Sequence, residues 1–149
     1  ERPTNKLDPH YNGQYDFWLM DKNCKKGGIR IEVKASRAVK RKSGDSLIIK
    51  ALSSDSVEGF DMNFQQIKPK CCDVFVWIAV WRDKIRYFVL SSDEVASNKY
   101  YSVGQHRGNV GEGQLWLKES NIAEFQCYEV TVREILEKIK EKGKEQIDS

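Results

Sequence analysis

The amino-acid sequence predicts a mixed α/β domain in which a central β-sheet is flanked by helices. Residues 29–36 alternate apolar and polar side chains with a period of two, which is typical of a half-buried strand. Residues 73–81 (DVFVWIAVW) are apolar on both faces, which favours a central strand that is covered on both sides. Two capping boxes, at residues 91–94 and 131–134, predict helices that begin directly after strands.

The composition is that of one globular domain. The 149 residues are 40% hydrophobic and 32% charged, and the net charge of +3 is too small to indicate a partner. The four cysteines show no CxxC spacing, which argues against a zinc site, and the adjacent Cys71 and Cys72 favour reduced thiols in the cytoplasm. The longest apolar run, residues 74–81, is too short to span a bilayer, so we expect no membrane association.

A lead-in and a β-hairpin are expected at the start of the chain. Residues 1–13 hold two of the three prolines, which suggests an extended lead-in. The chain begins with Glu1 rather than Met, which is compatible with a segment preceding it. Turn residues at 21–28 join an aromatic-rich arm at 14–20 to the alternating strand at 29–36, so we predict a hairpin there.

A helix is expected in the middle of the chain. Residues 37–45 form a basic loop, and residues 47–52 form either a short strand or the closing arm of that loop. Asp55, with Glu58 three residues later, fits a helix N-cap. Apolar residues then recur at helical spacing as far as Pro69: Phe60, Phe64 and Ile67. We therefore predict a helix between the basic loop and the apolar strand.

Strands and short helices are expected in the second half of the chain. Residues 85–90 should form an antiparallel partner of the apolar strand, and a short helix should follow Leu90. Four glycines between residues 100 and 113 indicate a long loop. Further strands are expected at residues 114–118 and 125–130.

The chain is expected to end in an amphipathic helix. This helix begins after Thr131 and carries Leu136 and Ile139 on its apolar face. Past Gly143 the residues are mostly charged, and we expect residues 143–149 to fray. No repeat or linker interrupts the pattern, so we predict a single domain over residues 1–149.

The hairpin brings two carboxylates and an ammonium group together. Its turn geometry places Asp16 opposite Val33 or Glu32, depending on one residue of register. Lys34 lies two residues beyond Glu32, on the same polar face of the strand. Asp21 falls within the turn, so Asp16 is the better partner for Glu32.

Neighbouring carboxylates of this kind are suited to a divalent cation. Hard oxygen ligands without His or Cys favour Mg²⁺, with Mn²⁺ as a substitute. A lysine beside them, here Lys34, can orient or deprotonate a water molecule or stabilise developing negative charge, which suits phosphodiester hydrolysis. A Glu-x-Lys triplet alone is commonly a solvated strand face with ion pairs. The addition of Asp16 in pairing register, with the flanking elements, favours the functional interpretation.

The constellation resembles the PD-(D/E)XK nuclease superfamily, which includes the type II restriction endonucleases. The similarity consists of Asp16 on the first hairpin arm, the Glu32-Val33-Lys34 triplet on the second arm, and then the predicted helix and a buried strand. It implies a restriction-endonuclease-like fold with a mixed central sheet. It also implies that Asp16, Glu32 and the Val33 carbonyl are metal ligands and that Lys34 is the catalytic lysine.

Other positions match this family less closely. Many members carry a polar residue on the helix after the lysine strand, and Gln65 and Gln66 fit that place, with Gln66 preferred. Tyr15 stands where the family often has proline. The family core usually begins with a helix that bears another acidic residue. Glu1 and Asp8 are poor candidates for that residue, so the additional ligand is unassigned.

Two segments are candidates for nucleic-acid contacts. The basic residues that follow the Glu-x-Lys strand would lie close to its polar face and bind DNA phosphates: Arg37, Lys40, Arg41 and Lys42. The alternative is a solvated loop. The polar loop at residues 104–109 could enter a groove and contact bases through Gln105, Arg107 and Asn109. Trp77, Trp81 and Trp116 are expected to be core or sheet-packing residues, whereas Trp18 would share the face of Asp16 and border the site.

These observations predict a Mg²⁺-dependent DNA endonuclease similar to a restriction enzyme. Its partner would be double-stranded DNA, and a homodimer is expected because cutting both strands needs two sites or two events. One alternative is a non-catalytic nucleic-acid-binding module on the same fold. Another is a nuclease that acts in DNA repair, on DNA junctions or on RNA.

Overall fold

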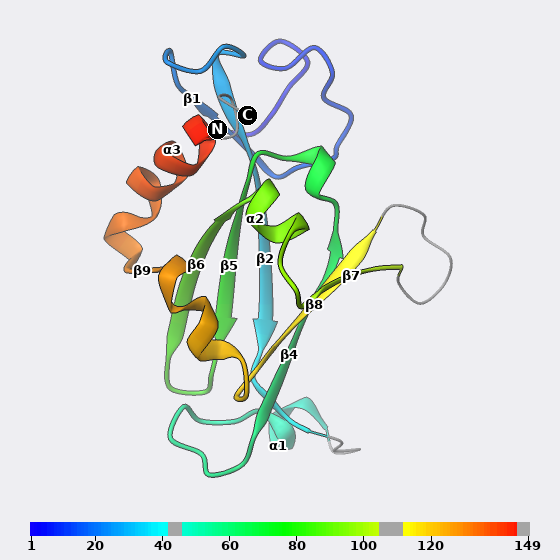
Figure 1. Ribbon diagram of the computed structural model, residues 1–149, viewed down its shortest axis with the longest axis vertical. Coiled ribbons are helices and arrows are strands. Elements are labelled where there is room, and N and C mark those ends of the chain that lie inside the picture. Colours follow the sequence, from blue (N-terminus) through cyan, green and yellow to red (C-terminus); the bar gives the residue numbers. More distant parts are fainter. Residues whose placement is uncertain (42–45, 105–111, 146–149) are drawn as a thin grey trace.

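The computed structural model describes residues 1–41, 46–104 and 112–145, which form a mixed α/β structure with two β-sheets and few helices (Figure 1). The first sheet has the strand order β1-β2-β5-β6-β9: β1 (Phe17–Met20), β2 (Gly28–Arg37), β5 (Val74–Val80), β6 (Ile85–Ser91) and β9 (Glu129–Val130). The second has the order β3-β4-β8-β7: β3 (Val39–Lys40), β4 (Phe60–Ile67), β7 (Tyr101–Val103) and β8 (Gly113–Lys118). The α-helices are α1 (Leu47–Lys50), α2 (Ser92–Ala96) and α3 (Ile135–Glu145), and the 3₁₀ helices are η1 (Pro69–Cys71), η2 (Ile122–Tyr128) and η3 (Val132–Glu134).

The first sheet contains the predicted hairpin and the predicted central strand. β1 pairs antiparallel with β2, β2 pairs parallel with β5, and β5 pairs antiparallel with β6. β5 thus lies in the middle of the sheet, and most of its side chains are buried. The mixed α/β class, the hairpin, the central strand and its antiparallel partner are therefore confirmed.

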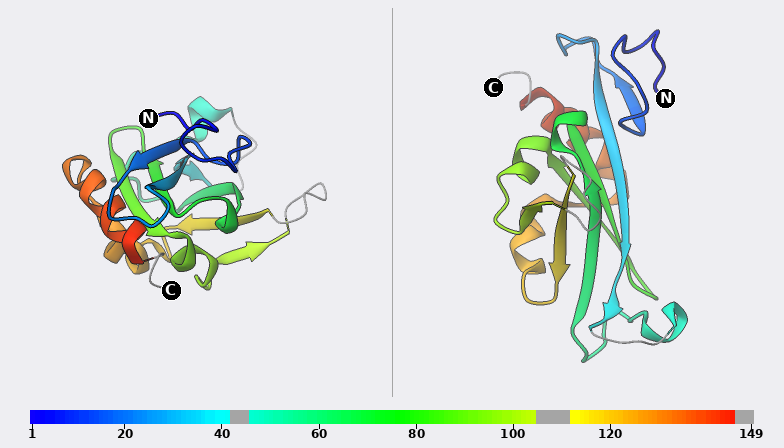
Figure 2. Two further views of the ribbon diagram at one scale, coloured as in Figure 1. Left: turned by 90° about the horizontal axis from the view of Figure 1, so that it is seen from above. Right: turned by 90° about the vertical axis from the view of Figure 1, so that its right-hand side faces the viewer.

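β2 connects the two sheets. It is ten residues long, and only Ala38 separates it from β3, which pairs with β4 in the second sheet. In the right-hand view of Figure 2 it is the long cyan strand that runs along most of the molecule. Glu32 and Lys34 therefore lie in the first sheet, whereas the chain that follows them enters the second.

The two faces of the first sheet are covered differently. On one face of β5, Phe75 and Trp77 pack in a cluster with residues of the second sheet, including Phe64 of β4 and Leu115 of β8. The rings of Phe64 and Trp77 are stacked, with their centroids 4.9 Å apart. On the other face, a smaller cluster contains Ile139 of α3. Helix α3 thus covers one face, and the second sheet covers the other together with α2 and η2, which contribute Val95 and Phe125 to its cluster (Figures 1 and 2). The prediction of a sheet flanked by helices is therefore correct in part.

The helix predicted before the apolar strand is wrong, because residues 60–67 form strand β4. Met62 and Phe64 are both buried and follow the period of two that a strand requires. The pairing of β4 with β8 shifts register between Phe64 and Ile67, which marks a bulge. The shift puts the fully buried Ile67 back on the inner face. As a result, Phe60, Phe64 and Ile67 have the spacing of a helix although they lie on a strand.

Two further predictions in the second half of the chain need correction. Residues 122–128 form the 3₁₀ helix η2, and only Glu129 and Val130 form a strand, β9. Ile122, Phe125 and Tyr128 recur every three residues, the period of a 3₁₀ helix, and pack against the larger core cluster. The loop predicted over residues 100–113 contains strand β7 at its start, and Gly113 begins β8.

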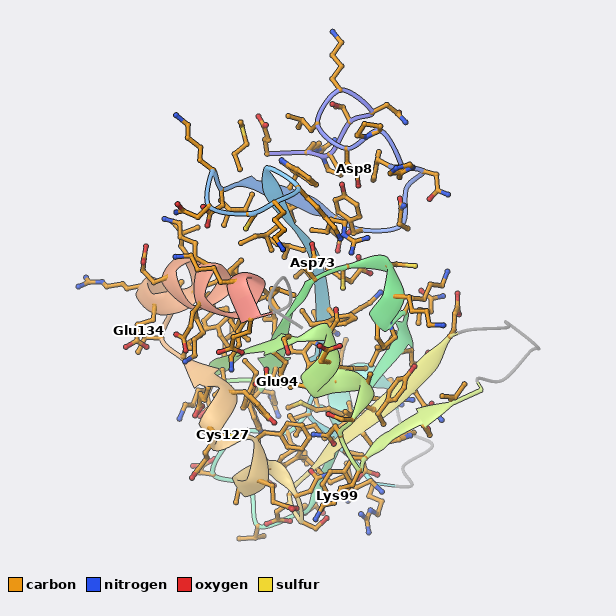
Figure 3. The ribbon with its side chains drawn as sticks, turned by 45° about the horizontal axis from the view of Figure 1, so that its top comes forward. Asp8, Asp73, Glu94, Lys99, Cys127 and Glu134 are labelled. Carbon is orange, nitrogen blue, oxygen red and sulfur yellow. The ribbon has the colours of Figure 1, made fainter. Side chains whose placement is uncertain are left out.

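The two capping boxes are confirmed, and they fix the start of α2 and the start of the C-terminal helical segment. The Ser91 side chain accepts from the Glu94 backbone, and the Glu94 carboxylate accepts from the Ser91 backbone. Glu94, labelled in Figure 3, also forms an ion pair of 2.7 Å with Lys142 of α3. Thr131 and Glu134 form the second box. Helix α3 continues past Gly143, which is buried, to Glu145, so residues 143–145 are helical rather than frayed as predicted.

The lead-in forms turns beside β1 rather than an extended segment. The Glu1 ammonium donates to the Trp18 carbonyl over 2.8 Å, and the Trp18 N–H donates back to the Glu1 carbonyl over 2.9 Å. The Tyr15 hydroxyl donates to the buried Asp8 carboxylate over 2.9 Å. These contacts hold the segment that precedes Asp16. Among the described helices, none is long and apolar enough to cross a membrane.

Candidate functional site

A small cavity lies where the start of the first sheet meets the end of β4. Its volume is about 200 Å³, which is smaller than a site for a drug-sized ligand. It is lined by residues from five parts of the chain: Gly13, Gln14, Asp16, Glu32, Lys34, Gln66, Lys68, Cys72 and Glu112. All four residues predicted to be catalytic, Asp16, Glu32, Lys34 and Gln66, are among them.

The register of the hairpin decides which residue faces Asp16. Phe17 pairs with Ile31, so the preceding position, Asp16, lies opposite Glu32. The Asp16 N–H donates to the Ile31 carbonyl over 3.0 Å, and the Asp16 carboxylate accepts from the Val33 N–H over 2.8 Å. The first of the two predicted carboxylates is therefore oriented by the backbone of the strand that carries the second.

Lys34 is ion-paired with Glu32 in this arrangement. Its Nζ lies 2.6 Å from Glu32 Oε1, and both side chains are less than one fifth exposed. The two residues are two positions apart on β2, so they share a face and point toward the second sheet, as do their partners on β5, Phe75 and Trp77. The Glu-x-Lys spacing therefore produces the proximity that was predicted from it.

The electrostatics of the cavity make the charged form of Glu32 costly. Burial raises the pKa of Glu32 above its ordinary value, and the negative charge of Asp16 raises it further. The Lys34 ammonium opposes this shift only in part. Two neighbouring carboxylates with a single close ammonium thus leave negative charge that a bound cation would compensate.

Asp16 and Glu32 fit the requirements of a Mg²⁺ ion. In the described part of the chain, no group of three or more His, Cys, Asp or Glu side chains is close enough to hold a metal. Mg²⁺, however, usually binds through only one or two carboxylates and completes its shell with water and substrate phosphate oxygens. The two carboxylates, with their hard oxygen donors, supply that number. Val33 contributes its N–H to Asp16, and the role of its carbonyl as a ligand stays a prediction.

Gln66 reaches the cavity from a strand bulge rather than from a helix. Its φ is +54°, the left-handed region that non-glycine residues rarely adopt, and it falls where the β4–β8 register shifts. The neighbouring Gln65 is exposed and does not line the cavity. The preference for Gln66 over Gln65 therefore agrees with the structure, although the predicted helix does not.

Sequence reasoning missed Lys68 and Glu112. The Lys68 Nζ lies 2.9 Å from Glu112 Oε1, and both residues line the cavity. They lie 44 positions apart in the sequence and meet because Ile67 pairs with Gly113 in the second sheet. Only a correct assignment of β4 as a strand and of its pairing with β8 would have indicated this contact.

Cys72 also lines the cavity, but its thiol is protonated and unreactive. Burial raises the pKa of Cys72 to about 12, and its Sγ lies 3.5 Å from the Ser92 hydroxyl. A thiol with this pKa is neutral at physiological pH, and it is therefore a poor nucleophile and metal ligand.

The predicted basic loop does not lie beside the cavity. Arg37 ends β2, five residues beyond Glu32, and α1, which follows it in the chain, lies at the opposite end of the molecule from the β1–β2 turn (Figure 1). Lys40 is paired with Glu58 at 2.8 Å and Arg41 with Asp61 at 3.4 Å. Contrary to expectation, Lys40 and Arg41 do not lie close to Glu32 and Lys34, because β2 stays extended as far as Arg37. Their contact with phosphates stays a prediction.

The other predicted nucleic-acid contacts fall outside the described residues: Lys42, Gln105, Arg107 and Asn109. The two described residues that flank the 105–111 segment, Gly104 and Glu112, are joined by a backbone hydrogen bond of 3.0 Å. Of these two residues, Glu112 lines the cavity.

The tryptophans differ in part from expectation. Trp77 and Trp81 are buried in the core, as predicted. Trp116 lies on β8 opposite Asn63 and is 38% exposed, so it is a sheet residue rather than a core residue. The Lys118 ammonium lies over its ring at 5.6 Å. Trp18 is buried and packs on Gly28, where a Cβ would lie 2.3 Å from the indole. It supports the hairpin and is not among the residues that line the cavity.

Comparison with known proteins gives no external guide to this site. No protein-family model matches the chain, and no match is found among curated proteins or solved structures. The function must therefore be inferred from the chemistry of the cavity itself.

Proposed function

We propose that the protein is a Mg²⁺-dependent endonuclease that hydrolyses phosphodiester bonds in double-stranded DNA. The observation that carries the proposal is the convergence of Asp16, Glu32 and Lys34 on one small polar cavity. Two carboxylates that face each other, with a lysine on the same strand, match the needs of phosphodiester hydrolysis. The cavity volume suits a phosphate group and a cation better than a larger organic substrate.

Each residue of the cavity has a distinct task in this proposal. Asp16 and Glu32 would hold the Mg²⁺ ion, which supplies positive charge and Lewis acidity to the phosphodiester. Lys34, ion-paired with Glu32, would donate hydrogen bonds that orient a water molecule or stabilise charge on the phosphate. Gln66 would position that water or a phosphate oxygen through its amide. Hydrolysis forms a bond between water oxygen and phosphorus and breaks one ester bond, whose oxygen takes up a proton.

The topology around the cavity supports the resemblance to PD-(D/E)XK nucleases. The aspartate precedes the first strand of an antiparallel hairpin, the Glu-x-Lys triplet lies on the second strand, and that strand pairs parallel with the buried β5. The connection from β2 to β5 differs from the expected helix, because it contains β3, α1 and strand β4. A restriction-endonuclease-like core with a strand in place of that helix is therefore part of the proposal.

Plasmid cleavage tests the proposal directly. We expect the protein to nick or cut supercoiled DNA with Mg²⁺ or Mn²⁺ and to lose this activity in EDTA. Asp16→Asn, Glu32→Gln and Lys34→Met should each reduce the cleavage rate at least about a hundredfold with unchanged circular dichroism. Glu129→Gln, which removes an equally close ion pair with Arg86 far from the cavity, is the control and should cleave normally. Absence of cleavage with either ion, or full activity of Lys34→Met, would contradict the assignment.

A non-catalytic nucleic-acid-binding module is the second candidate. The specific observation in its favour is the 2.6 Å ion pair between Lys34 and Glu32. Such a pair would stabilise the polar face of β2 equally well in a protein that has no catalytic activity. DNA binding without Mg²⁺ binding, measured by calorimetry, would favour this module.

A panel of duplex DNA, branched DNA and RNA substrates separates a restriction-type enzyme from a repair or RNA-processing nuclease. Sedimentation with and without DNA tests the expected homodimer.

The proposed cellular setting follows from the cysteines. Cys24, Cys71, Cys72 and Cys127 are all free thiols in the structure. A reducing cytoplasm, where we propose that the protein acts on DNA, preserves thiols in that form.

A further inference from the structure

The Lys68–Glu112 pair is the part of the cavity that the hairpin motif does not account for. Glu32 and Lys34 lie on β2 and Asp16 directly precedes β1 of the first sheet, whereas Lys68 follows β4 and Glu112 precedes β8 of the second. The pair therefore forms a second wall, opposite the hairpin. A charged pair in this position needs its own explanation.

The backbone around this pair is fixed. Ile67 is completely buried and pairs with Gly113, so Lys68 and Glu112 are the next residues outward from a ladder pair. Pro69 follows Lys68 and begins the 3₁₀ helix η1, which restricts the chain on that side. Gly113 lies against the Tyr101 ring, where a Cβ would be 2.3 Å from the nearest ring atom. Lys68 is thus presented from a rigid position.

Lys68 and Lys34 differ in their depth. The Lys34 side chain is 19% exposed, whereas the Lys68 side chain is 46% exposed, so Lys68 lies closer to the cavity mouth. The Glu112 side chain is only 11% exposed, and it therefore holds the Lys68 ammonium from the inner side. A phosphate that enters the cavity would meet Lys68 before it reaches Lys34.

The total charge of the cavity also favours a phosphate-binding role for Lys68. Asp16, Glu32 and Glu112 supply three negative charges, and Lys34 and Lys68 supply two positive ones, so the formal sum is one negative charge. One divalent cation and one phosphodiester would together bring the sum to zero. Without Lys68 the same occupants would leave one negative charge, which would oppose the entry of DNA.

We infer that Lys68 binds a non-bridging oxygen of the scissile phosphodiester and that Glu112 positions the Lys68 ammonium for this contact. The inference rests on the proposed nuclease function and adds a substrate-binding residue to it. Lys68 touches the substrate, and Glu112 acts only through Lys68.

Salt-dependent DNA binding tests the contact without requiring cleavage. A fluorescent duplex is titrated with Ca²⁺ in place of Mg²⁺ over a series of salt concentrations. The slope of log K against log salt is negative, and removal of one phosphate contact makes it less steep by about 0.9. We expect this change for Lys68→Met, and we expect Lys68→Arg to retain the wild-type slope because guanidinium also binds phosphate. Lys70→Met is the matched control, since Lys70 lies two residues away, is exposed and does not line the cavity.

Steady-state cleavage then tests the role of Glu112. A charge-assisted hydrogen bond to phosphate is worth about ten- to a hundredfold in kcat/KM, which is the loss expected for Lys68→Met. Glu112→Gln should lose less, because the lysine is retained. The double variant should be no worse than Lys68→Met alone, since Glu112 acts through Lys68. A purely structural pair would instead lower the melting temperature and leave the salt slope unchanged.

The outcomes of the two experiments separate the inference from the proposal beneath it. An unchanged slope and a kcat/KM of Lys68→Met within about twofold of wild type would overturn the inference while leaving the nuclease proposal intact. If wild type does not cleave but Lys68→Met still lowers the salt slope, the nuclease proposal is wrong and the phosphate contact stands. If Lys68→Met does not fold, Lys68→Gln takes its place, because an amide preserves polarity without charge.

Discussion

At the scale of single residues, the cavity places charge where it costs stability. Glu32 lies opposite Asp16 and is largely buried, and these two features raise its pKa. When folding raises the pKa of a carboxyl group, the native state accommodates the protonated form more favourably than the charged form. The charged form therefore destabilises the native state. Functional sites commonly retain such groups because activity requires them.

The first prediction is that Glu32→Gln abolishes cleavage and raises stability. Glutamine resembles the neutral acid, so at neutral pH the variant avoids the cost of a charged Glu32, and its melting temperature should exceed that of wild type. As the pH falls through the raised pKa of Glu32, wild type becomes neutral at this position too. The difference in melting temperature should therefore shrink toward acid pH. Thermal unfolding across a pH series measures it.

The control for this prediction is an ordinary ion pair. Glu129 forms a 2.6 Å ion pair with Arg86 on the same sheet but outside the cavity. Glu129→Gln breaks a favourable pair and should lower the melting temperature at neutral pH. A Glu32→Gln variant that melts below wild type at neutral pH would show that the Lys34 contact outweighs burial and repulsion.

A second prediction concerns the backbone of Gln66. Its positive φ is strained for any residue except glycine, and only mildly so for asparagine. Gln66→Gly should raise the free energy of unfolding by up to about 1 kcal/mol yet lower cleavage, because the amide is lost. Gln66→Asn should keep more activity, and Gln66→Val should destabilise by about 1 kcal/mol or more. Urea unfolding measures these changes, and a glycine variant less stable than the valine variant would contradict the assigned backbone.

At the scale of elements, the sequence predicts those parts whose signals are local. The hairpin, β5, β6 and the two capping boxes depend on neighbouring residues, and the structure confirms them. β4 was not predictable from periodicity, because its bulge shifts Ile67 to the spacing of a helix. Glu112 could not be placed in the site because its proximity to Lys68 depends on that same strand pairing. Three of the four predicted catalytic residues come from the local hairpin.

The third prediction concerns the packing of α3 on the first sheet. A Cβ at Gly143 would lie 2.5 Å from the Ile29 side chain, so the helix approaches the sheet at this residue. Alanine normally stabilises a helix by about 1 kcal/mol relative to glycine. Here Gly143→Ala should instead destabilise by about 1–2 kcal/mol, because overpacking outweighs propensity. Chemical denaturation measures the change.

Two variants show whether the contact with Ile29 is the cause. Lys144→Ala, at an exposed neighbouring position, should change stability by less than about 0.5 kcal/mol. In the Ile29→Ala background the clash is removed, so Gly143→Ala should become neutral or stabilising. If the Gly143→Ala effect is the same in both backgrounds, the clash is not its source.

At the scale of the whole molecule, the cavity and the basic loop lie far apart along one strand. Glu32 and Lys40 are eight positions apart, and an extended chain covers about 26 Å over that length. At 3.4 Å per base pair, this distance corresponds to about eight base pairs of duplex DNA. A DNA molecule that contacts both regions must therefore run along β2.

The last prediction follows from this distance. If Lys40 and Arg41 bind phosphates, the double variant Lys40→Gln/Arg41→Gln should weaken binding of long duplexes but leave hairpin stems shorter than about eight base pairs unaffected. Both side chains must exchange their carboxylate partners, Glu58 and Asp61, for phosphates to do so. Lys25→Gln/Lys26→Gln removes the same charge from the exposed β1–β2 turn and controls for net charge. Fluorescence anisotropy over a series of lengths measures the affinity. A loss that is equal at all lengths, or equal to that of the control, would mean that the basic loop acts only through its overall charge.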